Sequence, residues 1–127
     1  MPHLSVEYSG NLEGTAEVPG LLAALRDAMV ATGVFPLGGV RVRAFRADHW
    51  VIADGAGAED GFVAMALRMG EGRDAQTRAR AREAGFAAAE AWLRPRVPGP
   101  FALSLEVHEI VGSASEKRWN TVHERVR

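Results

Sequence analysis

The sequence has no cysteine, no long hydrophobic run and almost no excess charge of either sign. Its 127 residues include 15 Lys and Arg against 16 Asp and Glu, so the formal net charge is -1. The absence of cysteine excludes disulfides and thiolate metal sites. Runs of ~20 apolar residues are needed for a membrane-spanning helix, and none is present. Without a global basic field, neither nucleic acid nor a membrane surface is expected as a partner.

Length and composition indicate a small globular protein. The N-terminus lacks the charged-then-apolar pattern of a secretory signal, so a cytoplasmic location is expected. With 47% hydrophobic residues, the chain is long enough for one buried core and too short for a second domain to be expected. We therefore predict a single domain over residues 1–127, with small molecules or other protein chains as partners.

The first half of the chain alternates strand and helix patterns. Residues 3–9, HLSVEYS, alternate apolar and polar side chains, as a half-buried strand does. Residues 18–33, VPGLLAALRDAMVATG, predict a helix with Pro19 in its first turn and Gly33 at its C-terminal end. Residues 39–45, GVRVRAF, alternate again and predict a second strand.

The second half repeats this order. Residues 49–55, HWVIADG, are interpreted as a hairpin return of the second strand, ending in an Asp-Gly turn. A mostly apolar strand is predicted at 61–69, a helix at 74–94 and a last alternating strand at 101–110. The helix residues predicted to face the core are Ala75, Ala79, Phe86, Ala89 and Leu93.

This order predicts an α+β fold of two β-α-β units that form one four-stranded sheet with two helices on one face. The other face is expected to expose Phe, Met and Leu side chains of the strand at 61–69. Because a large exposed apolar face usually meets a partner, self-association around a symmetry axis is expected.

Several segments together resemble a known family. They are the start MPH…VE, ATGVFPLGGVRVR at 31–43, FVAMALRMGEGR at 62–73, and ALSLEVHEI at 102–110 followed by NTVH at 120–123. The chain resembles the 5-carboxymethyl-2-hydroxymuconate isomerase family of the tautomerase superfamily nearly end to end. The resemblance implies a homotrimer, no metal or organic cofactor, and a catalytic amino-terminal proline. The implied reaction converts a dienol carboxylate to its 2-oxo-ene isomer in aromatic-acid (homoprotocatechuate) degradation.

Pro2 is the candidate catalytic residue. If Met1 is removed, the ring nitrogen of Pro2 becomes a secondary amine that can carry a proton between oxygen and carbon. An α-amino group titrates at about 7.7 to 8.0, and nearby cations or burial lower its pKa towards a useful range for a base. The alternative is that Pro2 only precedes the first strand. A retained Met1 would leave an amide without a basic lone pair.

Arg41 is a candidate ligand for a substrate carboxylate. The family pattern places a carboxylate-binding arginine at this position, and a planar guanidinium can hold a carboxylate with two hydrogen bonds. The alternative is that Arg41 and Arg43 protect an edge strand by their charge. Arg43 is assigned to that structural role.

Arg73 is the second candidate ligand for a carboxylate. It follows Gly70 and Gly72 at a predicted helix start, where the helix dipole favours anions rather than a basic side chain. We therefore predict that Arg73 and the exposed amides bind an anion together. The alternative is a glycine turn with a solvated arginine. A phosphate loop is disfavoured because the Lys-Ser/Thr signature is missing.

Other candidates are weaker. Phe35 and Trp50 could be pocket walls, although core packing is the favoured role for both. Trp119 and the C-terminal tail are predicted to reach a neighbouring subunit. Four histidines are scattered without ligand spacing, so no metal site is predicted. They are His3, His49, His108 and His123.

Two other functions fit the same element order. Ferredoxin-like RNA-binding domains share it, but residues 59–69, EDGFVAMALRM, have an acidic residue where such domains have a basic one and lack alternating aromatics. A non-catalytic small-molecule-binding or oligomeric module is the second alternative. That module would bind a ligand without turnover and would be indifferent to a blocked N-terminus.

Overall fold

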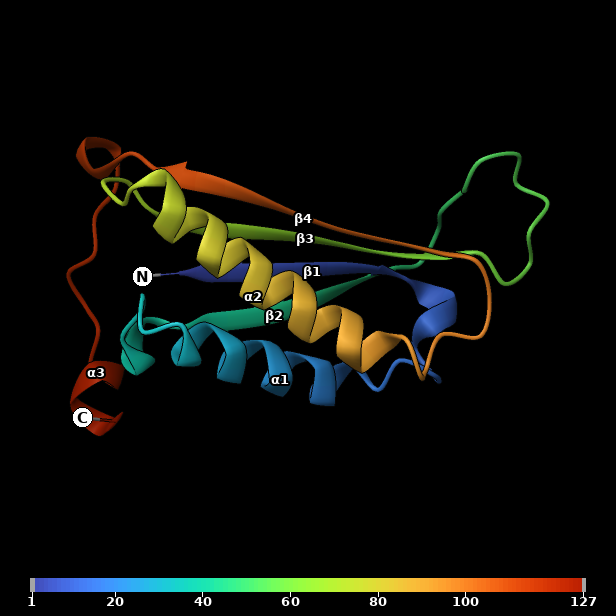
Figure 1. The fold of residues 1–127 in the computed structure, drawn as a ribbon, viewed down its shortest axis with the longest axis horizontal. Helices are drawn as coiled ribbons and strands as arrows, with labels where there is room; N and C mark the ends of the chain where they lie inside the picture. The colour runs from blue at the N-terminus through green and yellow to red at the C-terminus, as the bar shows by residue number, and fades with distance from the viewer. Residues whose placement is uncertain (1, 127) are drawn as a thin grey trace.

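The computed structural model describes residues 2–126 and contains two β-α-β units followed by a short tail (Figure 1). Its strands and helices are β1 (His3–Ser9), α1 (Val18–Ala31), β2 (Arg41–Ala47), β3 (Gly61–Gly70), α2 (Ala75–Leu93), β4 (Phe101–Ile110) and α3 (Val122–Val126). Three short 3-10 helices are η1 (Gly10–Leu12), η2 (Leu37–Gly39) and η3 (Gly112–Ala114).

The four strands form one mixed sheet in the order β2-β1-β3-β4. β1 is parallel to β2 and antiparallel to β3, and β3 is parallel to β4. Helices α1 and α2 lie on the same face of this sheet (Figure 1). The predicted α+β fold is therefore confirmed.

Local signals explain where the two long helices begin and end. Pro19 lies in the first turn of α1, and Gly33 follows its C-terminal end with a φ of 72°, a left-handed conformation that favours glycine. Asp74 caps α2 by accepting a hydrogen bond from the Thr77 amide at 2.8 Å. Within residues 2–126, no helix has both the length and the apolarity needed to cross a membrane.

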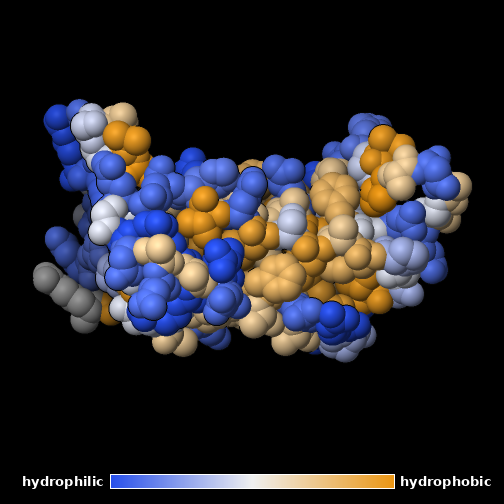
Figure 2. Space-filling view, turned by 45° about the horizontal axis from the view of Figure 1, so that its top comes forward, coloured by the Kyte–Doolittle hydropathy of each residue, from blue (hydrophilic) through white to orange (hydrophobic). Residues whose placement is uncertain are grey.

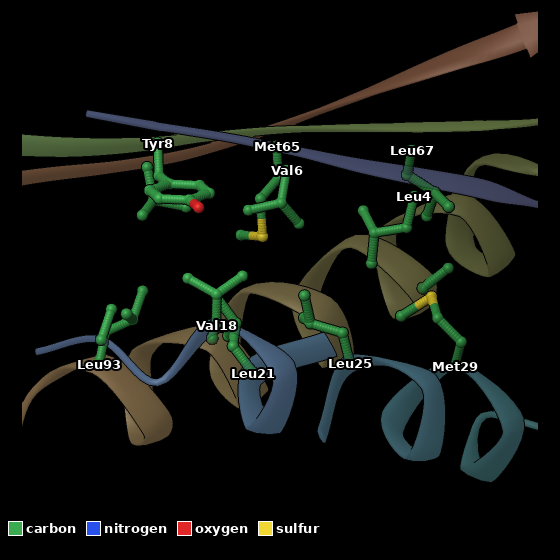
Figure 3. Close-up of a cluster of buried hydrophobic side chains, with 14 of the residues drawn as sticks. Leu4, Val6, Tyr8, Val18, Leu21, Leu25, Met29, Met65, Leu67 and Leu93 are labelled. Carbon is green, nitrogen blue, oxygen red and sulfur yellow. The ribbon is translucent and has the colours of Figure 1, made fainter. Parts of the chain in front are cut away.

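The core lies between the sheet and the two helices (Figure 3). The alternation predicted for β1 is confirmed, because its even-numbered residues from Leu4 to Tyr8 are buried. Across from them lie side chains of both helices, among them Leu21, Leu25, Met29 and Leu93. Tyr8 keeps its hydroxyl hydrogen-bonded to Glu13 Oε1 at 2.8 Å.

The buried side of α2 differs in part from the prediction, although Ala89 and Leu93 are buried as predicted. Ala75 is exposed, and Ala79 and Phe86 are only partly buried. The buried positions are Ala81, Gly85, Ala89 and Leu93. An added Cβ at Gly85 would lie 3.1 Å from Leu105 Cδ1 and 3.2 Å from Met29 Cε, so small residues on this side let α2 lie close to the sheet and to α1. An alanine-rich helix has little contrast between its sides, and this explains why the hydrophobic period misplaced Ala75, Ala79 and Phe86.

The uncovered face of the sheet also differs from the prediction. On β3, Met65, Leu67 and Met69 are buried in the core, and only the residues of opposite parity lie on the uncovered face. These are Phe62, Ala64, Ala66 and Arg68. Register and alternation add His3, Ser5 and Glu7 from β1 to this face. This face therefore mixes apolar with polar and charged side chains. Phe62 lies on it as predicted, but the Met and Leu side chains predicted there are in the core.

The hairpin return predicted at 49–55 is wrong as well. The segment between β2 and β3 forms no strand and extends beyond the sheet as a loop (Figure 1). A turn is present, since the Gly55 amide donates to the Ile52 carbonyl at 2.9 Å, but Val51 is 79% exposed. The Trp50 ring lies against Gly10, where an added Cβ would be 3.1 Å from Trp50 Cζ3. This contact directs the segment towards the end of β1 instead of along β2.

Candidate active site

Pro2 lies at the end of the sheet where β1 and β2 begin and β3 and β4 end (Figure 1). Its side chain is fully buried, and its carbonyl accepts a hydrogen bond from the Arg41 amide at 3.1 Å. The next residue, His3, pairs in register with Arg41 of β2 and with Arg68 of β3. Pro2 is therefore held in place beside three basic residues. Met1 lies outside the described residues, so its removal stays a prediction.

Arg41 is folded back towards η2. Its Nη1 donates to the Gly38 carbonyl at 2.7 Å and to the Val40 carbonyl at 3.3 Å. Within residues 2–126, no acidic side chain lies within 4.0 Å of its guanidinium. The guanidinium is thus oriented by backbone carbonyls, and its charge is not neutralised by a neighbouring carboxylate.

Arg73 lies in the turn between β3 and α2, as predicted. Its Nη1 donates to the Gly70 carbonyl at 3.1 Å, and its guanidinium carbon lies 5.1 Å from the centroid of the Phe35 ring. Phe35 is part of the core, which is the favoured one of its two predicted roles, and the cation lies over its ring. Gly72 has a φ of 106°, so this turn requires glycine there.

The pKa of His3 indicates the electrostatic environment at the end of the sheet near Pro2. Burial, followed by the charges of Arg43, Arg68 and Arg41, lowers the pKa of His3 below its ordinary value of 6.5. Arg43 Nη1 lies 3.1 Å from His3 Nδ1, and a neutral imidazole can accept this hydrogen bond. Arg43 was assigned to edge protection, but it also contacts a side chain at the candidate site. The local cations disfavour any further positive charge.

A cavity of about 500 Å³ opens at the same end. It is lined by His3, Arg68, Gly70, Glu71, Ile110, Gly112, Ala114, Ser115, Glu116 and Lys117. Of the residues that the structure describes, Pro2, Arg41 and Arg73 are not among the lining residues. The three predicted site residues therefore lie at one end of the sheet, but none of them lines this cavity.

Sequence reasoning missed Arg68 and Lys117, which both line this cavity. Lys117 is the only lysine in the chain, a signal that could have drawn attention to it. Arg68 offered no such signal, because its position beside His3 depends on the β1–β3 register.

The remaining candidates lie away from Pro2 or remain without a role. Trp50 contacts Gly10 at the opposite end of the sheet, so it is not a wall of this cavity. Trp119 is 89% exposed, and α3 packs against η2 of its own chain. In the described part of the chain, no group of three or more His, Asp or Glu side chains could hold a metal ion.

Comparison with known proteins gives consistent matches over the whole chain. A family model described as 5-carboxymethyl-2-hydroxymuconate isomerase matches residues 2–126. A 5-carboxymethyl-2-hydroxymuconate Delta-isomerase of Escherichia coli is 36% identical over 124 residues, which are 97% of this chain and 97% of that protein. The crystal structure of a 5-carboxymethyl-2-hydroxymuconate isomerase from Deinococcus radiodurans R1 has a TM-score of 0.88 and 32% identity, covering 99% of this chain and 94% of that one.

A structure of much lower sequence identity has the same fold. The "W0 fused 4-OT wild type symmetric trimer" has a TM-score of 0.70 and covers 93% of this chain and 94% of its own. At 16% identity, it supports the shared fold alone.

Proposed function

The chain belongs to the 5-carboxymethyl-2-hydroxymuconate isomerase family, and on that premise we propose that it isomerises 5-carboxymethyl-2-hydroxymuconate or a close dienol carboxylate, with Pro2 as the base. The observation that carries this proposal is the position of Pro2. It is buried at the start of β1, and its carbonyl is held by the Arg41 amide. We place the reaction in the cytoplasm, in the degradation of aromatic acids.

The proposed proton transfer needs one base and no other reactant. With Met1 removed, the Pro2 nitrogen takes the proton from the dienol hydroxyl, and the O–H electrons form the carbonyl as the double bonds shift. The same nitrogen then returns the proton to a carbon of the chain, so the overall reaction is an isomerisation. The cations that disfavour protonated His3 also disfavour protonated Pro2, which helps to keep the amine available as a base.

The arginines are proposed to bind the substrate carboxylates. Arg41 is oriented by the Gly38 carbonyl and has no acidic partner among residues 2–126, so it can pair with a substrate carboxylate. Arg73 is proposed to bind a second carboxylate from the turn before α2. Both positive charges also stabilise the negative charge that develops on the dienolate.

We propose that the working form is a homotrimer. The cavity of one chain does not include Pro2, Arg41 or Arg73, and a neighbouring subunit at this end would complete the walls of the site. The two edge strands, β2 and β4, are each paired on one side only within the described chain. A distant neighbour of the same fold is described as a symmetric trimer, which agrees with this proposal.

The test is the ultraviolet decay of 5-carboxymethyl-2-hydroxymuconate, on a sample whose intact mass shows loss of Met1. Wild-type protein should remove the dienol band rapidly. Pro2→Ala should lower kcat by about 100-fold or more, in line with the contribution of general acid-base groups. Pro95→Ala, which changes an exposed proline after α2, is the matched control and should keep full activity.

Two outcomes would contradict the proposal. No acceleration by a protein with free Pro2 would exclude this isomerase reaction, and ligand binding without turnover would then support the non-catalytic module. Full activity of Pro2→Ala would exclude the proline base while leaving the family assignment intact. Oligomeric state, measured by light scattering, tests the trimer separately.

A further inference from the structure

The C-terminal tail packs against the turn that precedes β2. Helix α3 and the 3-10 helix η2 lie side by side at the end of the molecule near Pro2, although they are far apart in the sequence (Figure 1). Each includes part of a segment that marked the family resemblance, PLGG at 36–39 and NTVH at 120–123. The proposed function uses the Gly38 carbonyl of the first segment and gives the second segment no role.

The contact between the two segments requires a residue without a side chain at position 38. Gly38 is buried, and an added Cβ there would lie 2.4 Å from His123 Nδ1 and 2.8 Å from His123 Cα. Its φ is not positive, so its backbone conformation does not require glycine. Close approach of His123 is therefore the physical reason for glycine at position 38.

Gly38 also contacts Arg41. The Gly38 carbonyl accepts the shorter of the two hydrogen bonds from Arg41 Nη1, at 2.7 Å. The turn around it is closed by backbone hydrogen bonds from Gly39 to Pro36 at 3.0 Å and from Val40 to Leu37 at 3.2 Å. His123, Gly38 and Arg41 therefore form a continuous chain of contacts from the tail to the candidate carboxylate ligand.

The start of α3 is fixed in the same region. The His123 amide donates to Asn120 Oδ1 at 3.4 Å, which connects the NTVH segment to the helix that it begins. The neighbouring Val122 is 39% exposed, and Trp119 is more exposed still. Directly after these exposed positions, the His123 ring is the side chain placed against Gly38.

We propose that His123 is a positioning residue for Arg41. By packing on Gly38, it holds the η2 turn in place, and the Gly38 carbonyl then holds the guanidinium in the orientation that a substrate carboxylate needs. The inference rests on the proposed function, because it takes Arg41 as a carboxylate ligand. A guanidinium that is already ordered loses less side-chain entropy when the substrate binds.

The first test is the kinetics of His123→Ala, measured with the dienol substrate. We expect KM to rise about 5- to 20-fold while kcat changes by less than about threefold, because an ordering cost falls on binding. His123→Phe keeps a ring against Gly38 and should restore most of the lost affinity. Val122→Ala, on the adjacent exposed position of α3, is the matched control and should leave both constants unchanged.

The decisive test is a double-mutant cycle with Arg41→Ala. If His123 acts through Arg41, adding His123→Ala to Arg41→Ala should not change KM further. Gly38→Ala disturbs the same contact from the η2 side and should raise KM, as His123→Ala does. It keeps the proposal testable if His123→Ala does not fold.

Different results would contradict the positioning role of His123 and the carboxylate role of Arg41. If His123→Ala raises KM equally in the presence and absence of the Arg41 side chain, the proposal is overturned, because a general structural role is additive. An unchanged KM in both His123→Ala and Gly38→Ala would also overturn it. An unchanged KM in Arg41→Ala would instead remove the carboxylate role of Arg41, and the positioning role with it. If KM rises strongly in Arg41→Ala but does not change in His123→Ala, the proposed function is retained.

Discussion

The two ends of the sheet have the same backbone arrangement and very different side chains. Since β1 is antiparallel to β3 and each is followed by a helix and a parallel strand, the two β-α-β units begin at opposite ends. The first unit begins with Pro2 before β1 and Arg41 at the start of β2. The second begins with Gly61 on β3 and Phe101 on β4.

The cavity at the end where the second unit begins is lined mainly by hydrophobic residues, together with Glu90 and Arg94. This cavity of about 460 Å³ lies between α2 and β4 and is lined by Phe86, Glu90, Leu93, Arg94, Val97, Gly99, Phe101 and Leu103. Figure 2 shows hydrophobic residues over the middle and right of the visible face, with hydrophilic residues among them. Nearby, the Trp92 indole donates to the Ala16 carbonyl at 2.8 Å, and the Arg96 guanidinium lies 3.7 Å from the centroid of its ring.

The end where the first unit begins has the opposite character, because His3, Arg41, Arg43 and Arg68 surround the start of β1. The comparison shows that the two ends have equivalent backbone arrangements and that their chemistry depends on the side chains present at each end. We call them the basic end and the hydrophobic end. We expect substitutions at the basic end to change activity and those at the hydrophobic end to change stability.

Leu93→Ala at the hydrophobic end should give the largest effect on stability. Leu93 is 1% exposed, and truncation of a buried leucine costs about 2 to 5 kcal/mol in the free energy of unfolding. Because the change lies far from Pro2, kcat of the folded protein should stay within about twofold of wild type. Urea unfolding and the dienol assay measure the two quantities. A strong loss of kcat in a fully folded sample would break the separation of the two ends.

Arg73→Ala and Arg94→Ala compare the two ends of a single helix. Arg73 precedes α2 at the basic end, and its loss should lower kcat/KM about 10- to 100-fold, as expected for a charge-assisted hydrogen bond to a carboxylate. Arg94 follows α2 and pairs with Glu90 at 2.6 Å on the exposed surface. Its loss should change kcat/KM by less than about twofold. Equal effects of the two variants would contradict the carboxylate role of Arg73.

Gly20→Ala tests a close aromatic contact at the hydrophobic end. An added Cβ would lie 2.3 Å from Trp92 Cζ2 and 2.5 Å from Trp92 Cη2, so the indole would have to move away from the Ala16 carbonyl. We expect a loss of about 1 to 3 kcal/mol in the free energy of unfolding. Activity should be retained, in contrast to Gly38→Ala, whose aromatic neighbour lies at the basic end. Unchanged stability would show that the Trp92 ring moves at little cost.

The smallest expected effect is a pH dependence that originates from His3. Its pKa is lowered in the folded state, so the unfolded chain binds a proton first as the pH falls through about 6.5. Stability should therefore be greatest above this value and should decline as the pH falls towards the folded-state pKa. His3→Gln should flatten this part of the profile in urea unfolding between pH 7 and pH 5. His49→Gln, at an exposed position beyond β2, is the control, and an equal change in both variants would contradict the assignment.

Much of the fold could be predicted because its signals are local. Alternation identified β1, β2 and β4, a mostly apolar run identified β3, and proline and glycine at residues 19 and 33 marked the ends of α1. The errors arose where local contrast was weak. Alanine-rich α2 gave no clear phase, and the apolar run of β3 did not reveal that Met65 and Phe62 lie on opposite faces. At 49–55, the contact of Trp50 with Gly10 outweighed a strand-like pattern.

The candidate site divides in the same way. Pro2, Arg41 and Arg73 were named from the family resemblance together with the chemistry of their side chains, and their roles stay predictions. The pairing of Arg68 with His3 and the packing of His123 on Gly38 could not be predicted. Both join segments that are distant in the chain, and strand register and tail docking depend on the free energy of the whole packed molecule. Local patterns therefore specified the elements and the candidate chemistry, while long-range packing set which side chains meet.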